Sequence, residues 1–347
     1  MVVDEAQATA ALRDTDQSLR TLDDAGDVAA DAVDDVGEAA ERSTGKLKMV
    51  KKAIAGVTAG LAALAIGTSV AKDFEQSMAN VAAVSGIDKT SDQFSRLEKE
   101  ARRLGASTTF TATEAGEGLT FLGMAGFSAS EQLDALESTL QLAQAGNLGL
   151  GESADIATNI LSAFKLEATQ TTRVADVLAL TAVSANTDVR QMGEAMKFLA
   201  PTASALGISL EEASAALAIL ANSGLRGSIA GRNLQTAFVK MLAPTAEADR
   251  AIRDIGFSLD EVNPEIVGFQ TALERLSRLD AQGIAKVFGV ENMKAVITLL
   301  SGLTGEDGLE GFLAKLREAD GTVARIARML TDTFGASIKK VTSAFSE

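Results

Sequence analysis

The sequence predicts an all-α protein, in which a long N-terminal coiled-coil-like helix precedes a bundle of about ten to twelve short helices. Three observations predict this fold. Apolar residues recur at heptad spacing through the first 70 residues. Glycines and helix-capping residues then divide the chain into short segments with helical stripes. Aromatic residues make up only 4% of the chain, whereas β-strands favour aromatic and β-branched side chains.

The heptad pattern begins at Leu12, the first a position, and continues to Ala71 without interruption. Apolar side chains occupy fourteen of its eighteen a and d positions. This regularity predicts a helix that packs against other helices in a left-handed supercoil. The expected interface positions are Leu12, Leu19, Leu22, Val33, Val36, Leu47, Val50, Ile54, Val57, Leu61 and Leu64.

Two arrangements are open for this helix. It could pack on the body of its own chain, as an ordinary amphipathic helix, or on other copies of itself. The long, narrow stripe favours self-association. Leu at a with Val at d, as at Leu47 and Val50, favours three or more strands, so a trimer is the first expectation and a hexamer the second.

Charge is concentrated at the N-terminal end. Residues 1–45 carry nine Asp, three Glu and three Arg, a net −9 that leaves −6 of the total −15 for the rest. This acidity argues against specific nucleic-acid binding, which normally needs a basic face. The expected domains are an acidic heptad helix (1–45), an apolar Ala/Gly-rich helix (46–72) and a helical body (73–347).

The apolar helix contains an uncharged stretch, residues 53–71, with lysines on both sides. Its length suffices to cross a hydrocarbon core, and Gly56 and Gly60 form a small-xxx-small motif that permits close helix packing. A buried bundle helix, a permanent membrane span and a span exposed only after assembly are all open interpretations.

In the body, Ser or Thr followed three residues later by Glu predicts four capped helix starts. These pairs are Thr111–Glu114, Ser128–Glu131, Ser209–Glu212 and Ser258–Glu261. The expected helix ends are Gly105, Gly126, Gly146, Gly207, Gly224 and Gly256.

Two prolines and a C-terminal stripe complete the expectations for the body. Pro201 should break or kink the helix around it, whereas Pro264 should begin one. The last segment, from Thr322, is amphipathic. Its apolar stripe is Ile326, Leu330, Phe334 and Ile338.

The chain contains no His and no Cys. This excludes the usual zinc, haem and iron–sulfur ligands and every catalytic device that uses His or Cys, so no metal, cofactor or enzyme activity is expected. The glycine-rich run 224–231 is no phosphate loop, because Arg232 and Asn233 stand where Lys and Ser or Thr are needed. A tight turn between two helices is the expected structure there.

The run Leu-Gly-Ala-Ser-Thr-Thr-Phe-Thr-Ala-Thr-Glu-Ala at 104–115 resembles a signature of the phage tail tape measure core region. The clearest similarity is Ala-Asn-Ser-Gly-Leu-Arg-Gly-Ser-Ile-Ala-Gly at 221–231, and the resemblance extends from about Phe74 to the C-terminus. Other blocks occur in family order at 124–127, 140–146, 154–159, 174–179, 200–203, 206–209 and 287–289.

The resemblance implies a virion structural protein that fills the lumen of the tail tube, sets tail length during assembly and assists genome ejection. Its implied partners are further copies of itself, the tail tube and tail tip proteins, and the host membrane during ejection. No catalytic residue carries over. Family members are commonly longer, so these residues are either the ruler of a short tail or the front of a larger one.

Two other functions are weighed against this one. A membrane-inserting pore or channel former would use residues 53–71. A coiled-coil partner protein, such as an effector or a signalling rod, would use the heptad stripe. Several blocks in the correct order favour the tape measure over the coiled-coil partner, whereas membrane insertion is compatible with a later stage of the tape measure's work.

Overall fold

A computed structural model describes residues 71–331, which belong to one unit of the chain that begins at Ser69. Every regular element in this range is helical, which confirms the all-α prediction. The helices α3 to α17 and three short 3-10 turns outnumber the ten to twelve helices expected.

A helical segment, 71–85, comes first. It is followed by α3 (Asp92–Ser107), α4 (Ala112–Met124), α5 (Ala129–Gly146), α6 (Leu150–Phe164), α7 (Thr171–Ser184), α8 (Val189–Ala205), α9 (Leu210–Asn222) and α10 (Gly227–Leu242). The remaining α-helices are α11 (Ala246–Asp254), α12 (Pro264–Val267), α13 (Phe269–Leu276), α14 (Ala281–Phe288), α15 (Met293–Ser301), α16 (Leu309–Arg317) and α17 (Thr322–Thr331). The 3-10 turns are η1 (Ala168–Gln170), η2 (Asp260–Val262) and η3 (Val290–Asn292).

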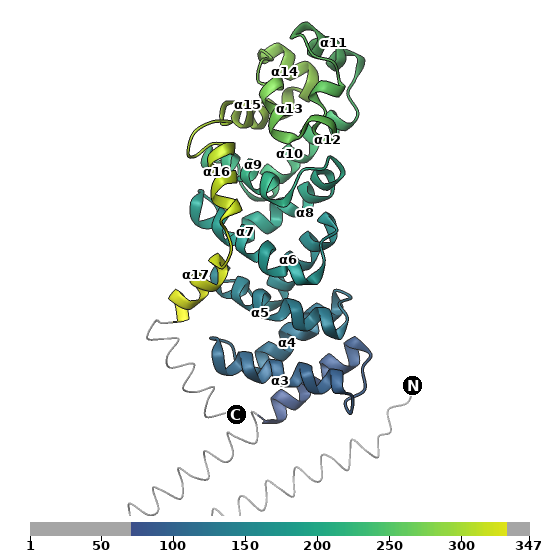
Figure 1. Ribbon diagram of the computed structural model, residues 1–347, viewed down its shortest axis with the longest axis vertical. Coiled ribbons are helices and arrows are strands. Elements are labelled where there is room, and N and C mark those ends of the chain that lie inside the picture. Colours follow the sequence, from purple (N-terminus) through teal and green to yellow (C-terminus); the bar gives the residue numbers. More distant parts are fainter. Residues whose placement is uncertain (1–70, 332–347) are drawn as a thin grey trace, which may run out of the picture. The chain divides into compact units, whose positions relative to one another are not determined.

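Helices α3 to α10 stack as a two-row array (Figure 1). Each contacts its neighbours in the chain and also the helix two places along, so α4, α6, α8 and α10 form one row and α3, α5, α7 and α9 the other. The first residues of α4, α6, α8 and α10 lie 38, 39 and 38 residues apart. This is the organisation of an α-solenoid, in which repeated helix pairs contact mainly adjacent pairs. The sequence analysis did not predict it.

One type of turn recurs between these helices. A residue with positive φ ends the helix, and the N–H of the apolar residue after it donates to the carbonyl five residues back, a Schellman motif. Phe127 bonds Leu122 in this way at 3.2 Å, and Ile208 bonds Ala203 at 2.9 Å. The same pairing joins Ile87 to Ala82, Leu148 to Ala143, Leu166 to Leu161, Leu225 to Leu220 and Phe257 to Ile252. The same turn therefore ends helices of both rows.

Five of the six expected helix ends are confirmed: α5 ends at Gly146, and Gly126, Gly207, Gly224 and Gly256 all have positive φ beyond a helix. Gly105 is a correction, because α3 continues through it to Ser107. A Cβ at Gly105 would lie 2.8 Å from Ala112 Cα, so this glycine permits close packing of α3 on α4. Gly146 is the last residue of α5, and Asn147, with φ 49°, takes the left-handed position instead.

Three of the four expected capping boxes are confirmed, at the starts of α4, α5 and α9. At the fourth, the Ser258 N–H and hydroxyl both donate to Glu261, at 2.9 and 3.0 Å, but the pair precedes only the 3-10 turn η2. Pro264 begins α12 as expected.

Pro201 was expected either to break or to kink its helix. The helix is not broken there. It lies exposed in the last turns of α8, which continues to Ala205. Pro lacks the N–H that would bond the carbonyl of Lys197, so the helix loses one hydrogen bond near its end and the ring projects into solvent.

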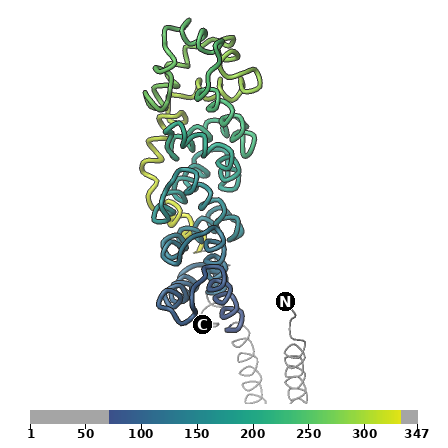
Figure 2. The backbone as a smooth tube through the Cα atoms, turned by 90° about the vertical axis from the view of Figure 1, so that its right-hand side faces the viewer, coloured from purple at the N-terminus to yellow at the C-terminus, as the bar shows by residue number. Residues whose placement is uncertain are grey.

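The far end of the solenoid carries α11 to α15, and the chain then returns along the α5–α7–α9 row (Figures 1 and 2). Helix α16 contacts α9 and α7, and α17 contacts α7 and α5. The stripe expected for α17 is rotated. Val323, Ala327 and Thr331 are buried, whereas Leu330 is 43% exposed. Phe334 and Ile338 lie outside the described residues.

Candidate functional site

The sequence-predicted interface lies outside the described residues. This applies to the heptad positions from Leu12 to Leu64, to Gly56 and Gly60, and to all but the last residue of the apolar stretch 53–71. Between residues 71 and 331, no helix is long and apolar enough to cross a membrane.

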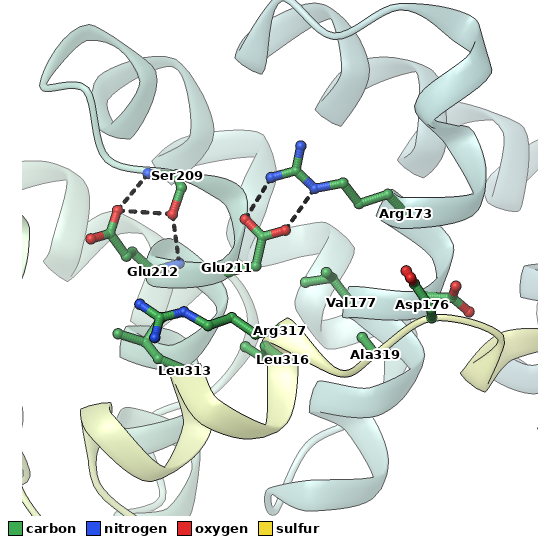
Figure 3. A pocket seen from close by; sticks show the side chains of 11 residues that line it. Arg173, Asp176, Val177, Ser209, Glu211, Glu212, Leu313, Leu316, Arg317 and Ala319 are labelled. Atoms are coloured by element: carbon green, nitrogen blue, oxygen red, sulfur yellow. Dashed lines mark hydrogen bonds and ion pairs between the residues drawn. The ribbon is translucent and has the colours of Figure 1, made fainter.

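The polar site that the structure does show is the seam where α16 and α17 meet α7 and α9 (Figure 3). A cavity of about 420 Å³ lies in this seam. Charged side chains from α7, α9, α16 and the linker after α16 line it: Arg173, Asp176, Glu211, Glu212, Arg317 and Asp320. Apolar residues of α7 and α16, among them Val177 and Leu316, form the rest of its wall.

Asp176 is the most buried charged group of the seam, with 1% of its surface exposed. Its two carboxylate oxygens accept the backbone N–H groups of Gly321 at 2.9 Å and Val323 at 2.7 Å. Both donors are at the start of α17, where N–H groups have no partner within the helix and the helix dipole favours a negative charge. Asp176 of α7 therefore caps α17 from a distant part of the chain.

Gln144 of α5 holds the other end of α17. Its side-chain amide donates to the Ala327 carbonyl at 2.7 Å and to the Thr331 hydroxyl at 2.8 Å. Polar side chains from two solenoid helices thus bind α17, Asp176 at its first N–H groups and Gln144 at Ala327 and Thr331.

The carboxylates beside Asp176 also have structural partners. Arg173 of α7 donates to both oxygens of Glu211 in α9, at 2.7 and 2.8 Å, and this bidentate pairing raises the pKa of the Arg173 guanidinium. Glu212 accepts from the Ser209 N–H and hydroxyl in the capping box of α9. The adjacent Glu211 and Glu212 thus join α9 to α7 and begin α9, which accounts for both carboxylates structurally.

Sequence reasoning missed Asp176 and Gln144. Asp176 stands inside the apolar stripe of Val174, Val177 and Leu178, all buried, and a carboxylate in such a place needs a partner. The position of Asp176 within an apolar stripe therefore indicates, from sequence alone, a buried carboxylate with a structural role. Gln144 gave none, because its partners follow it by 183 and 187 residues.

The comparisons with known proteins that found a match all name phage tail proteins. The family model of the phage-related minor tail protein matches residues 98–335, most of the chain. The tape measure protein of Pneumococcus phage Dp-1 is 31% identical over 294 residues, which are 82% of this chain and 25% of that protein. The probable tape measure protein of Escherichia phage P2 is 28% identical over 84% of this chain and 37% of its own length. No solved structure matches the chain.

A third relative, the probable tape measure protein of Clostridium phage phiCD119, is 23% identical over 93% of this chain and 36% of its own length. The chain thus spans between a quarter and somewhat more than a third of these relatives. The family match begins in α3 and ends just beyond α17, so it takes in the solenoid and the returning helices. The chain therefore belongs to the phage-related minor tail protein family and resembles the tape measure proteins of several phages.

Proposed function

We propose that this chain is a tail tape measure protein, a structural component of a phage tail. Its role is to occupy the lumen of the growing tube, to set tail length during assembly and to assist genome ejection. The family match over residues 98–335 carries the proposal, because it covers nearly all of the described fold. The relatives named as tape measure proteins align with 82% and 84% of the chain.

The fold bears on how such a protein would measure length. Among α3 to α17 the longest helix is α5, with 18 residues, or about 27 Å. A continuous helix over residues 71–331 would be roughly 390 Å long. Because the described helices fold back on one another in two rows, they contribute far less length than that. We assign the measuring role to the heptad helix and to the parts of longer relatives beyond the shared segment.

On this proposal the solenoid is a folded part of the ruler. Solenoids present extended surfaces to partners, and the tail tube and tail tip proteins are the partners that a tape measure would contact. The heptad interface from Leu12 to Leu64 would join copies of the chain, with a trimer as the first expectation and a hexamer as the second.

Membrane insertion through residues 53–71 would be a later step of the same function, during ejection. A charge in the middle of that stretch should prevent it, because a charged residue at the bilayer centre is costly. Liposome association of the full chain should be lost in Leu61→Asp and kept in Leu61→Ile. Equal association of both variants would rule out insertion through this stretch.

The proposed function is tested in a phage that encodes this chain. Purified tails should contain it, and an in-frame deletion of its gene should abolish tails of uniform length. Expression of the chain from a plasmid should restore them. Virions that keep normal tails of unchanged length without the chain would contradict the proposal.

A further inference from the structure

We propose that α17 is a releasable latch. It docks on α5 and α7, is fastened in part by polar groups of the solenoid, and undocks as a unit about the turn at Gly321 while the solenoid and α16 stay folded. This goes beyond the proposed function, because it assigns a conformational switch to one helix. Four observations support it.

The first observation is topological. Solenoid helices contact near neighbours in the chain, so their packing does not need α17. The hydrogen bonds of α17 to the solenoid, in contrast, join residues between 145 and 187 positions apart. Undocking α17 therefore removes an added element and leaves the neighbour contacts of α3 to α10 in place.

The second observation concerns the docking face. The side chains that α17 buries are small: Thr322, Val323, Ala327 and Thr331. Of its larger apolar residues, Ile326 is partly buried against the core, whereas Met329 is 67% exposed and Leu330 is 43% exposed. Helix α16 is the opposite case, because it buries Leu309, Phe312, Leu313 and Leu316. Since hydrophobic stabilisation follows the apolar area buried, the larger buried side chains of α16 contribute more of it than the small ones of α17.

The third observation is the fastening itself. Within the described residues the Asp176 carboxylate has no cationic partner, and its hydrogen bonds go to the backbone of Gly321 and Val323. A carboxylate that caps α17 in the docked state is hydrated by water once α17 leaves. The polar-lined cavity of about 420 Å³ beside Asp176 gives water a place to enter the seam. The fastening is thus satisfied in both states.

The fourth observation is a hinge. Gly321 separates α16 from α17, is exposed and has a φ of +76°, a value that other residues adopt rarely. Rotation about this single turn can lift α17 while α16 stays docked on α9. The position of the glycine defines which segment moves.

Amide hydrogen exchange of the full chain, read by mass spectrometry, tests the latch. In the unmodified chain, protection of α17 should be at least about tenfold lower than that of α16 and α7, because local opening exposes α17 alone. Equal protection of α16 and α17 would overturn the proposal, since the two helices would then open together.

Variants make the test specific. Asp176→Ala removes the cap and should lower the protection of α17 by about a further tenfold, with that of α16 unchanged. Gln144→Ala, at the other end of α17, should act in the same direction without a change in the buried centre of the seam. Asp188→Ala is the matched control, because Asp188 caps α8 through the Gln191 N–H at 2.8 Å and does not touch α17.

Two outcomes distinguish a releasable α17 from an α17 that is an integral part of the solenoid core. Faster exchange confined to residues 322–331 in the Asp176 and Gln144 variants, and absent from the Asp188 variant, supports the latch. Exchange in the Gln144 variant that rises equally across α5, α7, α16 and α17 would show that α17 is an integral part of the solenoid core. That result would overturn the proposal even if the Asp176 variant failed to fold.

Discussion

Gly231 of α10 packs directly on the backbone of Ala195 in α8, so closely that a Cβ on Gly231 would lie 2.7 Å from the Ala195 Cα. Both residues are buried in the row formed by α4, α6, α8 and α10. Gly231 is also the last residue of the 221–231 block, the clearest of the family-like motifs. The last glycine of that block therefore makes a close helix–helix contact that only glycine permits.

Gly231→Ala should destabilise the chain by about 1–3 kcal/mol, because the added methyl forces two helix backbones apart. The loss is measured by urea unfolding followed by circular dichroism. Gly149→Ala is the matched control, since no heavy atom lies within 4 Å of the added Cβ there. The control should cost no more than about 1 kcal/mol, from its position at the helix N-cap. Equal losses in the two variants would contradict this packing account.

Lys165 occupies a left-handed position, with φ 56°, at the C-terminal end of α6. Five of the six other Schellman turns have glycine at that point. Lys165→Gly should therefore stabilise the chain by about 0.5–1 kcal/mol, because glycine adopts positive φ without the Cβ penalty. Lys165→Ala keeps the Cβ and should bring no gain. The difference between the two unfolding free energies isolates the backbone effect.

The capping box at the start of α5 lowers the pKa of Glu131. Hydrogen bonds from the Ser128 hydroxyl and N–H hold its pKa below the ordinary value of 4.5. Because the folded-state pKa is depressed, this contribution to stability is present above the unfolded pKa and is lost as the pH falls through the folded pKa. A carboxyl-carbon NMR titration of Glu131 should show the low pKa.

Ser128→Ala should return the pKa of Glu131 upward toward its ordinary value, and should cost about 1 kcal/mol of stability at neutral pH through the lost cap. Ser107→Ala is a suitable control, because the Ser107 hydroxyl only donates to the Arg103 carbonyl within α3, at 2.9 Å. An unchanged Glu131 titration in Ser128→Ala would mean that the capping bonds do not form in solution.

The sequence could predict the fold class and the local ends of helices because both depend on short-range chemistry. Ser209 and Glu212 lie one helical turn apart, so their capping box can be read from spacing alone. Gly105 was misassigned as a helix end because its role, contact with Ala112, depends on how α3 meets α4. Spacing along the chain does not contain that information.

The sequence analysis also missed the two-row stack, although the sequence contains a pattern that indicates it. The turns Gly126-Phe127-Ser128 and Gly207-Ile208-Ser209 share one pattern of a left-handed residue, an apolar residue and a cap. Elsewhere Asn147 and Lys165 replace the glycine, which obscures the repeat. The Asp176 cap of α17 is harder to find, since it joins residues 147 positions apart. Only the folded chain brings these groups together.

Self-association through the heptad stripe is tested by sedimentation equilibrium of the full chain. Trimers are the first expectation and hexamers the second, and Leu12→Lys with Leu19→Lys should lower the mass toward that of the monomer, because charges at a positions disrupt the seam. Val183→Lys on α7, outside the heptad stripe and at a side chain that is 64% exposed, is the comparison variant and should leave the oligomer intact. A monomer before any substitution would mean that the stripe packs within its own chain.

Tail length, measured by electron microscopy of virions, tests the central claim most directly. Deletion of residues 12–39, four whole heptads, keeps the register of the stripe and should shorten the tail by roughly 42 Å if that helix measures length at 1.5 Å per residue. A tandem duplication of the same residues should lengthen the tail by the same amount. Tails that assemble at the original length in both variants would contradict the assignment of this chain as a ruler.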